Sequence, residues 1–100
     1  MDIINAIAKV RFNSAKPQRV SLVRNPTFQA DLICMEGGQA LAVEGGEWLY
    51  YVITGTASLV GNGPAMQTPT GQMASAVNEK HVITNPSDRR LVILALETIR

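Results

Sequence analysis

The sequence is poor in residues with reactive or metal-binding side chains. Among its 100 residues there is one histidine and one cysteine, and only 17% of the residues are charged. The single cysteine, Cys34, excludes an internal disulfide and any cysteine-cluster zinc site, and a lone thiol suits a reducing compartment. We interpret Cys34 as a small buried hydrophobe rather than a nucleophile.

Two classes of partner are disfavoured by what the chain lacks. The nine basic residues are scattered along the sequence and the net charge is only +1, so no stripe of lysine and arginine is available to neutralise the phosphates of a nucleic acid. No segment approaches the ~18 unbroken apolar residues that a bilayer span requires. We therefore expect no nucleic acid or membrane partner and a cytoplasmic location.

What the chain does contain is typical of a compact β protein. It is 46% hydrophobic, which suits a packed core, and its length predicts one domain over residues 1–100. Glycine, proline and asparagine interrupt it at short intervals, and the runs between them are rich in β-branched, aromatic and aliphatic residues. These runs cover residues 19–23, 28–35, 48–54, 57–60, 81–84 and 91–96. The pattern predicts an all-β sandwich or barrel in which the pairs Gly37-Gly38 and Gly45-Gly46 form hairpin turns.

The N-terminal segment can be interpreted in two ways. The apolar residues of 1–12 fall near helical spacing, yet the same residues could form a leading strand at a sheet edge. We expect residues 1–18 to form an arm, with a short helix or an extra edge strand, and residues 19–97 to form the barrel.

Two of the predicted strands, residues 48–53 and 91–96, are apolar on both faces. In the first, Trp48, Tyr50 and Val52 point one way, while Leu49 and the alternate residues after it point the other way. An antiparallel sheet in a free monomer normally has one wet face. The second apolar face therefore predicts a two-fold homodimer that packs sheet on sheet.

The order of strands and glycines resembles the cupin superfamily over roughly residues 19–97. The strongest pieces are residues 50–55 (YYVITG), which resemble the end of the first cupin motif, and residues 81–88 (HVITNPSD), which resemble the end of the second. The resemblance implies a double-stranded β-helix, or jelly-roll, barrel with a metal or small-molecule pocket in its interior. It also implies that Asn78, where the family has glycine, adopts the left-handed backbone that asparagine tolerates.

The same resemblance indicates that the family's metal site is degenerate here. Counting back from Gly55, the first motif's ligand positions fall on Ala42, Glu44 and Trp48. Alanine cannot coordinate a metal, and the tryptophan indole offers only a donor N–H. The neighbouring Glu47 could look into the pocket only if a bulge shifted the strand by one residue.

The second motif retains its histidine as His81, the only one in the chain. If any divalent metal binds, His81 and Glu44 are its candidate ligands, but zinc sites commonly take three or four protein ligands. We therefore expect no resident metal or other cofactor. His81 is then a hydrogen-bonded interior residue, an acid or base, or a contact to a ligand.

The sequence thus predicts a binding pocket formed by His81, Glu44, Trp48, Tyr50 and Ala42. Trp48 is either ordinary core or an aromatic wall for a ligand. The function that we favour is metal-free binding or sensing of a small molecule. The alternatives are a small enzyme, either metal-dependent or using His81 and Glu44 as acid and base, and an interaction protein whose barrel is filled by its own side chains.

Overall fold

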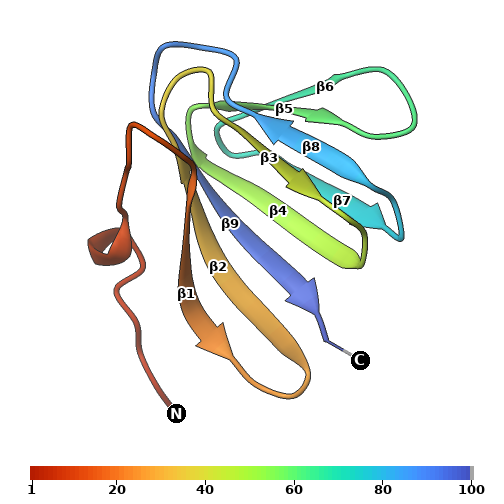
Figure 1. The fold of residues 1–100 in the computed structure, drawn as a ribbon. Helices are drawn as coiled ribbons and strands as arrows, with labels where there is room; N and C mark the ends of the chain where they lie inside the picture. The colour runs from red at the N-terminus through yellow and green to blue at the C-terminus, as the bar shows by residue number, and fades with distance from the viewer. Residues whose placement is uncertain (100) are drawn as a thin grey trace.

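A computed structural model describes residues 1–99 of the chain (Figure 1). Within these residues the chain forms one short 3-10 turn, η1, and nine strands. Their bounds are η1 (Ile7–Lys9), β1 (Gln18–Arg24), β2 (Phe28–Met35), β3 (Ala40–Val43), β4 (Glu47–Thr54), β5 (Thr56–Val60), β6 (Met66–Pro69), β7 (Met73–Val77), β8 (His81–Thr84) and β9 (Leu91–Thr98). The prediction of an all-β chain is confirmed. Strands β3, β6 and β7 lie outside the apolar runs predicted from the sequence, and of these only β3 was expected from the family's order of strands and glycines.

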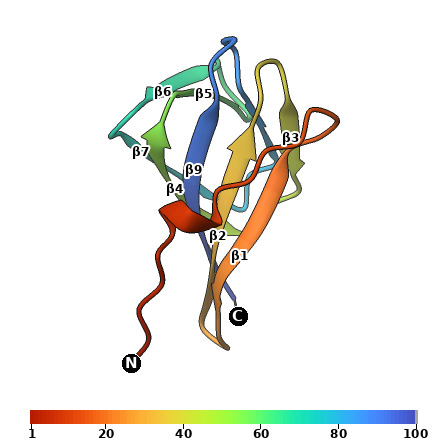
Figure 2. The ribbon, with the colours of Figure 1, turned by 90° about the vertical axis from the view of Figure 1, so that its left-hand side faces the viewer.

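The strands form two antiparallel sheets that face each other (Figures 1 and 2). One sheet has the order β1-β2-β9-β4-β7 and the other the order β3-β8-β5-β6. Several connections pass from one sheet to the other, as from β2 to β3, from β3 to β4 and from β8 to β9. The space between the sheets is therefore enclosed by strands that lie far apart in the sequence.

The main apolar core lies in the space between the two sheets. In β4 the side chains of Trp48, Tyr50 and Val52 are buried between the sheets, whereas Leu49 and Tyr51 are exposed on the outer face. This is the alternation that the sequence predicts for an antiparallel strand. The inner side chains of β4 share one apolar cluster with residues of β2, β5, β8 and β9.

The outer face of the five-stranded sheet is covered in part by the N-terminal arm, which lies over it in Figure 2. Val10 and Phe12 of the arm pack against a second apolar cluster formed by Leu32, Cys34 and Val92. Residues 1–12 form neither an α-helix nor a strand, and only the turn η1 interrupts their extended course. Within residues 1–99, no helix is of a length and apolarity that would allow it to cross a membrane.

The prediction that the two glycine pairs form hairpin turns is wrong. Gly37-Gly38 joins β2 to β3 and Gly45-Gly46 joins β3 to β4, and in each case the two strands belong to different sheets. The glycines therefore occupy crossings between the sheets. The prediction for Asn78 is confirmed, since its φ of 54° is left-handed, and its N–H donates to the Gly46 carbonyl at 2.7 Å.

A fully buried asparagine closes one end of the barrel. Asn85 has no exposed surface, and its Nδ2 donates to the carbonyl of Met35 at 3.2 Å and to that of Arg89 at 2.6 Å. Its backbone carbonyl accepts from Gly38. One side chain thus ties the end of β2 to the loop between β8 and β9.

Candidate functional site

His81 lies inside the barrel. It is the first residue of β8 and is paired with Val43 of β3, and its side chain is buried, with 6% of the residue exposed. Val43 and the next inward residue of β8, Ile83, belong to the apolar core. His81 is thus the polar end of an otherwise apolar inner row, which is the interior position that the sequence predicts.

His81 and Tyr50 form a buried hydrogen-bonded pair. The Tyr50 hydroxyl lies 2.6 Å from His81 Nε2, and His81 Nδ1 lies 2.8 Å from the backbone carbonyl oxygen of Glu79. Because a carbonyl oxygen can only accept, Nδ1 carries a proton, and in this tautomer Nε2 accepts from the Tyr50 hydroxyl. Burial raises the pKa of the Tyr50 phenol and outweighs the nearby charge of Arg19, which lowers it. The phenol therefore stays protonated as the donor.

Trp48 lies behind Tyr50 rather than beside His81. Its ring stacks on that of Tyr50 with 5.7 Å between centroids and 10° between planes, and its Nε1 donates to the Gly45 carbonyl at 2.7 Å. The guanidinium of Arg19 lies 5.3 Å from the Trp48 ring centroid. Trp48 therefore fixes the Tyr50 ring and does not line the cavity described next.

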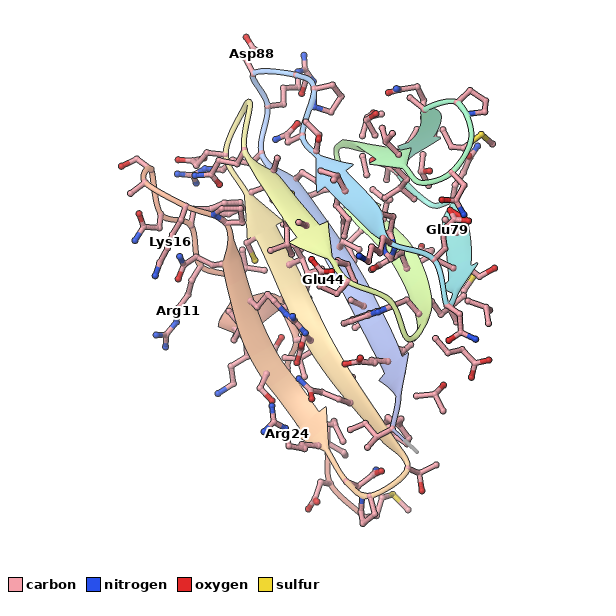
Figure 3. All side chains as sticks on the ribbon, turned by 45° about the vertical axis from the view of Figure 1, so that its right-hand side comes forward. Arg11, Lys16, Arg24, Glu44, Glu79 and Asp88 are labelled. Carbon is pink, nitrogen blue, oxygen red and sulfur yellow. The ribbon has the colours of Figure 1, made fainter. Side chains whose placement is uncertain are left out.

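A cavity of about 450 Å³ lies in front of Tyr50 and His81. Its walls come from β6, β7, the loop between β5 and β6, and the residue two before His81. The lining side chains that matter for recognition are the apolar Leu59 and Met66 and the polar Gln67, Thr68 and Glu79. Figure 3 shows Glu79 beside β7, near the loop that joins β5 and β6. The volume falls within the range of small-molecule sites, roughly 300–1,000 Å³.

The structure does not bring two of the predicted pocket residues to this cavity. Ala42 and Glu44 are exposed. Glu44 directly follows β3 (Figure 3), where its side chain is 84% exposed and its carboxylate lies 3.7 Å from the ammonium of Lys80. The inward residues of β3 are Leu41 and Val43, which pack in the core. The family spacing was thus one residue out of phase with the strand, and such a slip exchanges the two faces of a sheet.

Glu47 also faces away from His81. It pairs with Val77 in the same regular register in which Trp48 pairs with Ala76, so no bulge turns it inward. In residues 1–99 there is no group of three or more histidine, cysteine, aspartate and glutamate side chains that could hold a metal ion. The donor set around His81 therefore does not fit the family's metal centre.

On the other side of β9 from Tyr50, the barrel interior contains an ion pair that was not predicted from the sequence. Asp31 of β2 is buried, and its carboxylate accepts from Arg19 at 2.8 Å and from Gln29 Nε2 at 2.9 and 3.1 Å. The signal was an aspartate within an apolar strand, since a buried carboxylate requires a partner. Glu79, Gln67 and Met66 were missed because they belong to short strands and loops without an apolar pattern.

Comparison with known proteins gives the fold. No protein-family profile matches the chain, and no curated protein sequence matches it. Among solved structures, TT1209 from Thermus thermophilus has a TM-score of 0.91 and 22% identity, with 100% of this chain and 99% of that chain covered.

Two further structures carry descriptive names. An RmlC-like cupin protein from Desulfovibrio desulfuricans has a TM-score of 0.79 and 21% identity, and 95% of each chain is covered. A conserved protein with a double-stranded β-helix domain from Klebsiella pneumoniae has a TM-score of 0.86 and 18% identity, with 98% of this chain and 90% of that chain covered. The chain has the cupin fold, and the fold that the resemblance implied is confirmed.

Proposed function

We propose that this cupin-fold chain binds or senses a small organic molecule in the cavity in front of Tyr50 and His81, and that it does so without a resident metal. The observation that carries the proposal is the hydrogen-bonded pair of Tyr50 and His81 at the base of a cavity of about 450 Å³. Both ring nitrogens of His81 already have protein partners. A metal would have to displace one of them.

Two alternatives agree less well with the contacts around the cavity. An acid-base enzyme that uses His81 with Glu44 lacks its second group, because Glu44 is exposed and paired with Lys80. A barrel filled by its own side chains disagrees with a cavity large enough for a small ligand. Binding requires only what the cavity offers, which is a fixed polar base and an apolar wall.

The proposal is tested by a ligand screen together with a variant that fills the cavity. Untagged protein is screened by thermal shift against sugars, polyols, amines, organic acids and aromatic compounds, and hits are measured by calorimetry. Ala74→Leu places a larger side chain beside Tyr50, since Ala74 lines the cavity and pairs with Tyr50. We expect it to abolish binding of the hits. Ala42→Leu is the matched control, because Ala42 is exposed on the other sheet.

A second variant covers the case in which Ala74→Leu does not fold. Met66 lies at the rim of the cavity and is 62% exposed, so Met66→Trp obstructs the entrance without altering the core. Hits that bind both cavity variants as tightly as the parent would overturn the proposal, as would a screen without hits. Elemental analysis of the same preparation tests the metal-free part, and near-stoichiometric Mn, Fe, Ni, Cu or Zn would contradict it.

We also propose that two chains pair through the outer face of the five-stranded sheet. Phe28, Leu49, Tyr51, Met73 and Val77 are each at least 36% exposed there. A contiguous apolar face of this kind marks an interaction surface, and two-fold pairing would cover it with the same residues of a second chain. We expect the protein to act in the cytoplasm, where the single thiol of Cys34 stays reduced.

Light scattering after size-exclusion chromatography measures the pairing directly. The expected mass is twice the 10.8 kDa of one chain. Tyr51→Glu should yield the monomer, because it buries two charges in the paired face, whereas Ala42→Glu on the other sheet should not. A parent protein of 10.8 kDa at every concentration would contradict the pairing.

A further inference from the structure

The charges that line the cavity are of one sign. Within residues 1–99, the ionisable side chains that line it are those of Glu79, Tyr50 and His81, and no lysine or arginine is among the lining residues. Tyr50 is neutral, since burial raises its pKa. The nearest lysine in the sequence, Lys80, is 81% exposed and directs its ammonium to Glu44. The formal negative charge next to a bound ligand is therefore the carboxylate of Glu79.

Glu79 is held at the cavity wall by the loop between β5 and β6. Its Oε2 accepts from the backbone N–H of Asn62 at 3.4 Å, and it packs so closely over Gly61 that a Cβ at that position would collide with it. No salt bridge within residues 1–99 involves Glu79. The carboxylate is thus positioned by the protein, while its charge is left for a ligand to balance.

The polar groups of the cavity include hydrogen-bond acceptors. The Tyr50 hydroxyl donates its proton to His81 Nε2, so that its oxygen lone pairs remain. Gln67 Nε2 donates one of its two N–H groups to the hydroxyl of Ser58 at 3.2 Å, and its carbonyl oxygen remains an acceptor. These acceptors match a ligand that supplies hydrogen-bond donors. A carboxylate or phosphate would meet the like charge of Glu79, and within residues 1–99 no lysine or arginine lines the cavity to balance it.

The remaining wall is apolar and contains soft sulfur. Met66 and Leu59 line it, and the methionine side chain adapts to flat or irregular apolar bodies. A carboxylate and oxygen acceptors next to an apolar wall match a cationic head on an apolar body. We propose, on the basis of the binding function inferred above, that the ligand is a small organic ammonium, a primary amine protonated at neutral pH and carrying an apolar body.

Three probes with one ring and different charges test this inference. Benzylamine, benzyl alcohol and benzoate are titrated at pH 7.5 and followed by the NMR signals of Ala74, Ala76 and His81, which line the cavity. We expect saturable shifts with benzylamine, affinity for benzyl alcohol about tenfold weaker, and no binding of benzoate. Equal affinity for all three, or a preference for benzoate, would overturn the ammonium assignment.

A pair of glutamate variants locates the charge that is responsible. Glu79→Gln should lower the affinity for benzylamine by about five- to tenfold and leave the affinity for benzyl alcohol unchanged. The reason is that the lost interaction is a charge-assisted hydrogen bond in a partly hydrated cavity. Glu44→Gln removes an exposed carboxylate on the outer face and should change neither affinity. An identical loss in both variants, or no loss in Glu79→Gln, would contradict the role of Glu79.

The failure of this inference can be told apart from failure of the binding function. If benzylamine does not bind, but other compounds from the screen bind the parent and fail to bind Ala74→Leu, then the ammonium assignment is wrong while the proposed binding function of the cavity is supported. If neither benzylamine nor any compound of the screen binds, both proposals fall.

Discussion

Two buried polar groups lie on either side of β9 in the barrel interior and are satisfied in different ways. On β2 the charge of Asp31 is neutralised by Arg19, with Gln29 as a further donor. On β4 Tyr50 is hydrogen-bonded to His81, and both residues line a cavity. Trp48 lies between them, stacked on Tyr50 and beneath Arg19. The ion pair is complete within the protein, whereas the pair of Tyr50 and His81 lies beside open volume, where the proposed ligand would bind.

Breaking the ion pair should have the largest effect on stability. In Arg19→Met an apolar stem is retained while the guanidinium over Trp48 and its charge are lost, so that the buried Asp31 carboxylate keeps only Gln29. We expect a loss of about 2–3 kcal/mol in the free energy of unfolding, measured by urea denaturation. Asp31→Asn in the same chain should recover part of it. The control is Arg24→Met, an exposed change on the same strand; equal losses in both variants would contradict a special role for the pair.

High pH should lower the free energy of unfolding through the ionisation of Tyr50. Burial raises the pKa of the Tyr50 phenol above its ordinary value, which is about 10. Above that pH the phenol ionises in the unfolded chain but not in the folded one, so stability present at lower pH is lost as the pH rises, with a slope of at most about 1.4 kcal/mol per pH unit. Tyr50→Phe should lack this part of the slope.

Cys34, whose pKa burial also raises, contributes a slope of the same sign. It is present in the parent and in Tyr50→Phe alike, so it cancels when the two urea denaturation series are compared. If the free energy of unfolding falls equally steeply with pH in the parent and in Tyr50→Phe above a pH of about 10, the phenol is not kept protonated by the fold.

The hydrogen bond itself should have the smallest effect. Tyr50→Phe at neutral pH should lower the free energy of unfolding by about 1 kcal/mol, because the imidazole loses its donor but lies next to a cavity that admits water. A double-mutant cycle with His81→Leu should give a coupling energy of similar size, about 1 kcal/mol. Tyr51→Phe, on the exposed face of the same strand, serves as the control. A coupling near zero would mean that the pair is held by packing alone.

The strands that lie outside the predicted apolar runs share one property, which is their place at a sheet edge. β3, β6 and β7 each have a hydrogen-bonded neighbour on one side only. Edge strands are short and partly wet, so they lack the apolar runs that identify the central strands β2, β4, β8 and β9. Those central strands were predicted to within two residues at each end.

The sequence predicted the direction of side chains correctly within one strand, where successive residues alternate between the two faces. It failed where the prediction required counting residues from one strand back to another. Counting every second residue along β4 correctly turns Trp48 and Tyr50 inward. Counting back to β3 through the Gly45-Gly46 crossing does not preserve the phase, so Glu44 was placed on the wrong face. Glu79 belongs to a loop, and nothing local in the sequence indicates that it lines a cavity.

Glu79 serves the cavity twice, through two chemically independent parts of one residue. Its main-chain carbonyl selects the tautomer of His81 and thereby orients the Tyr50 hydroxyl, while its carboxylate supplies the negative charge. Exchanging the side chain at this position alters the charge while the peptide group continues to hold the imidazole. In the binding function proposed above, a single substitution at this position would change the class of molecule that the cavity accepts, while Tyr50 and His81 stay in place.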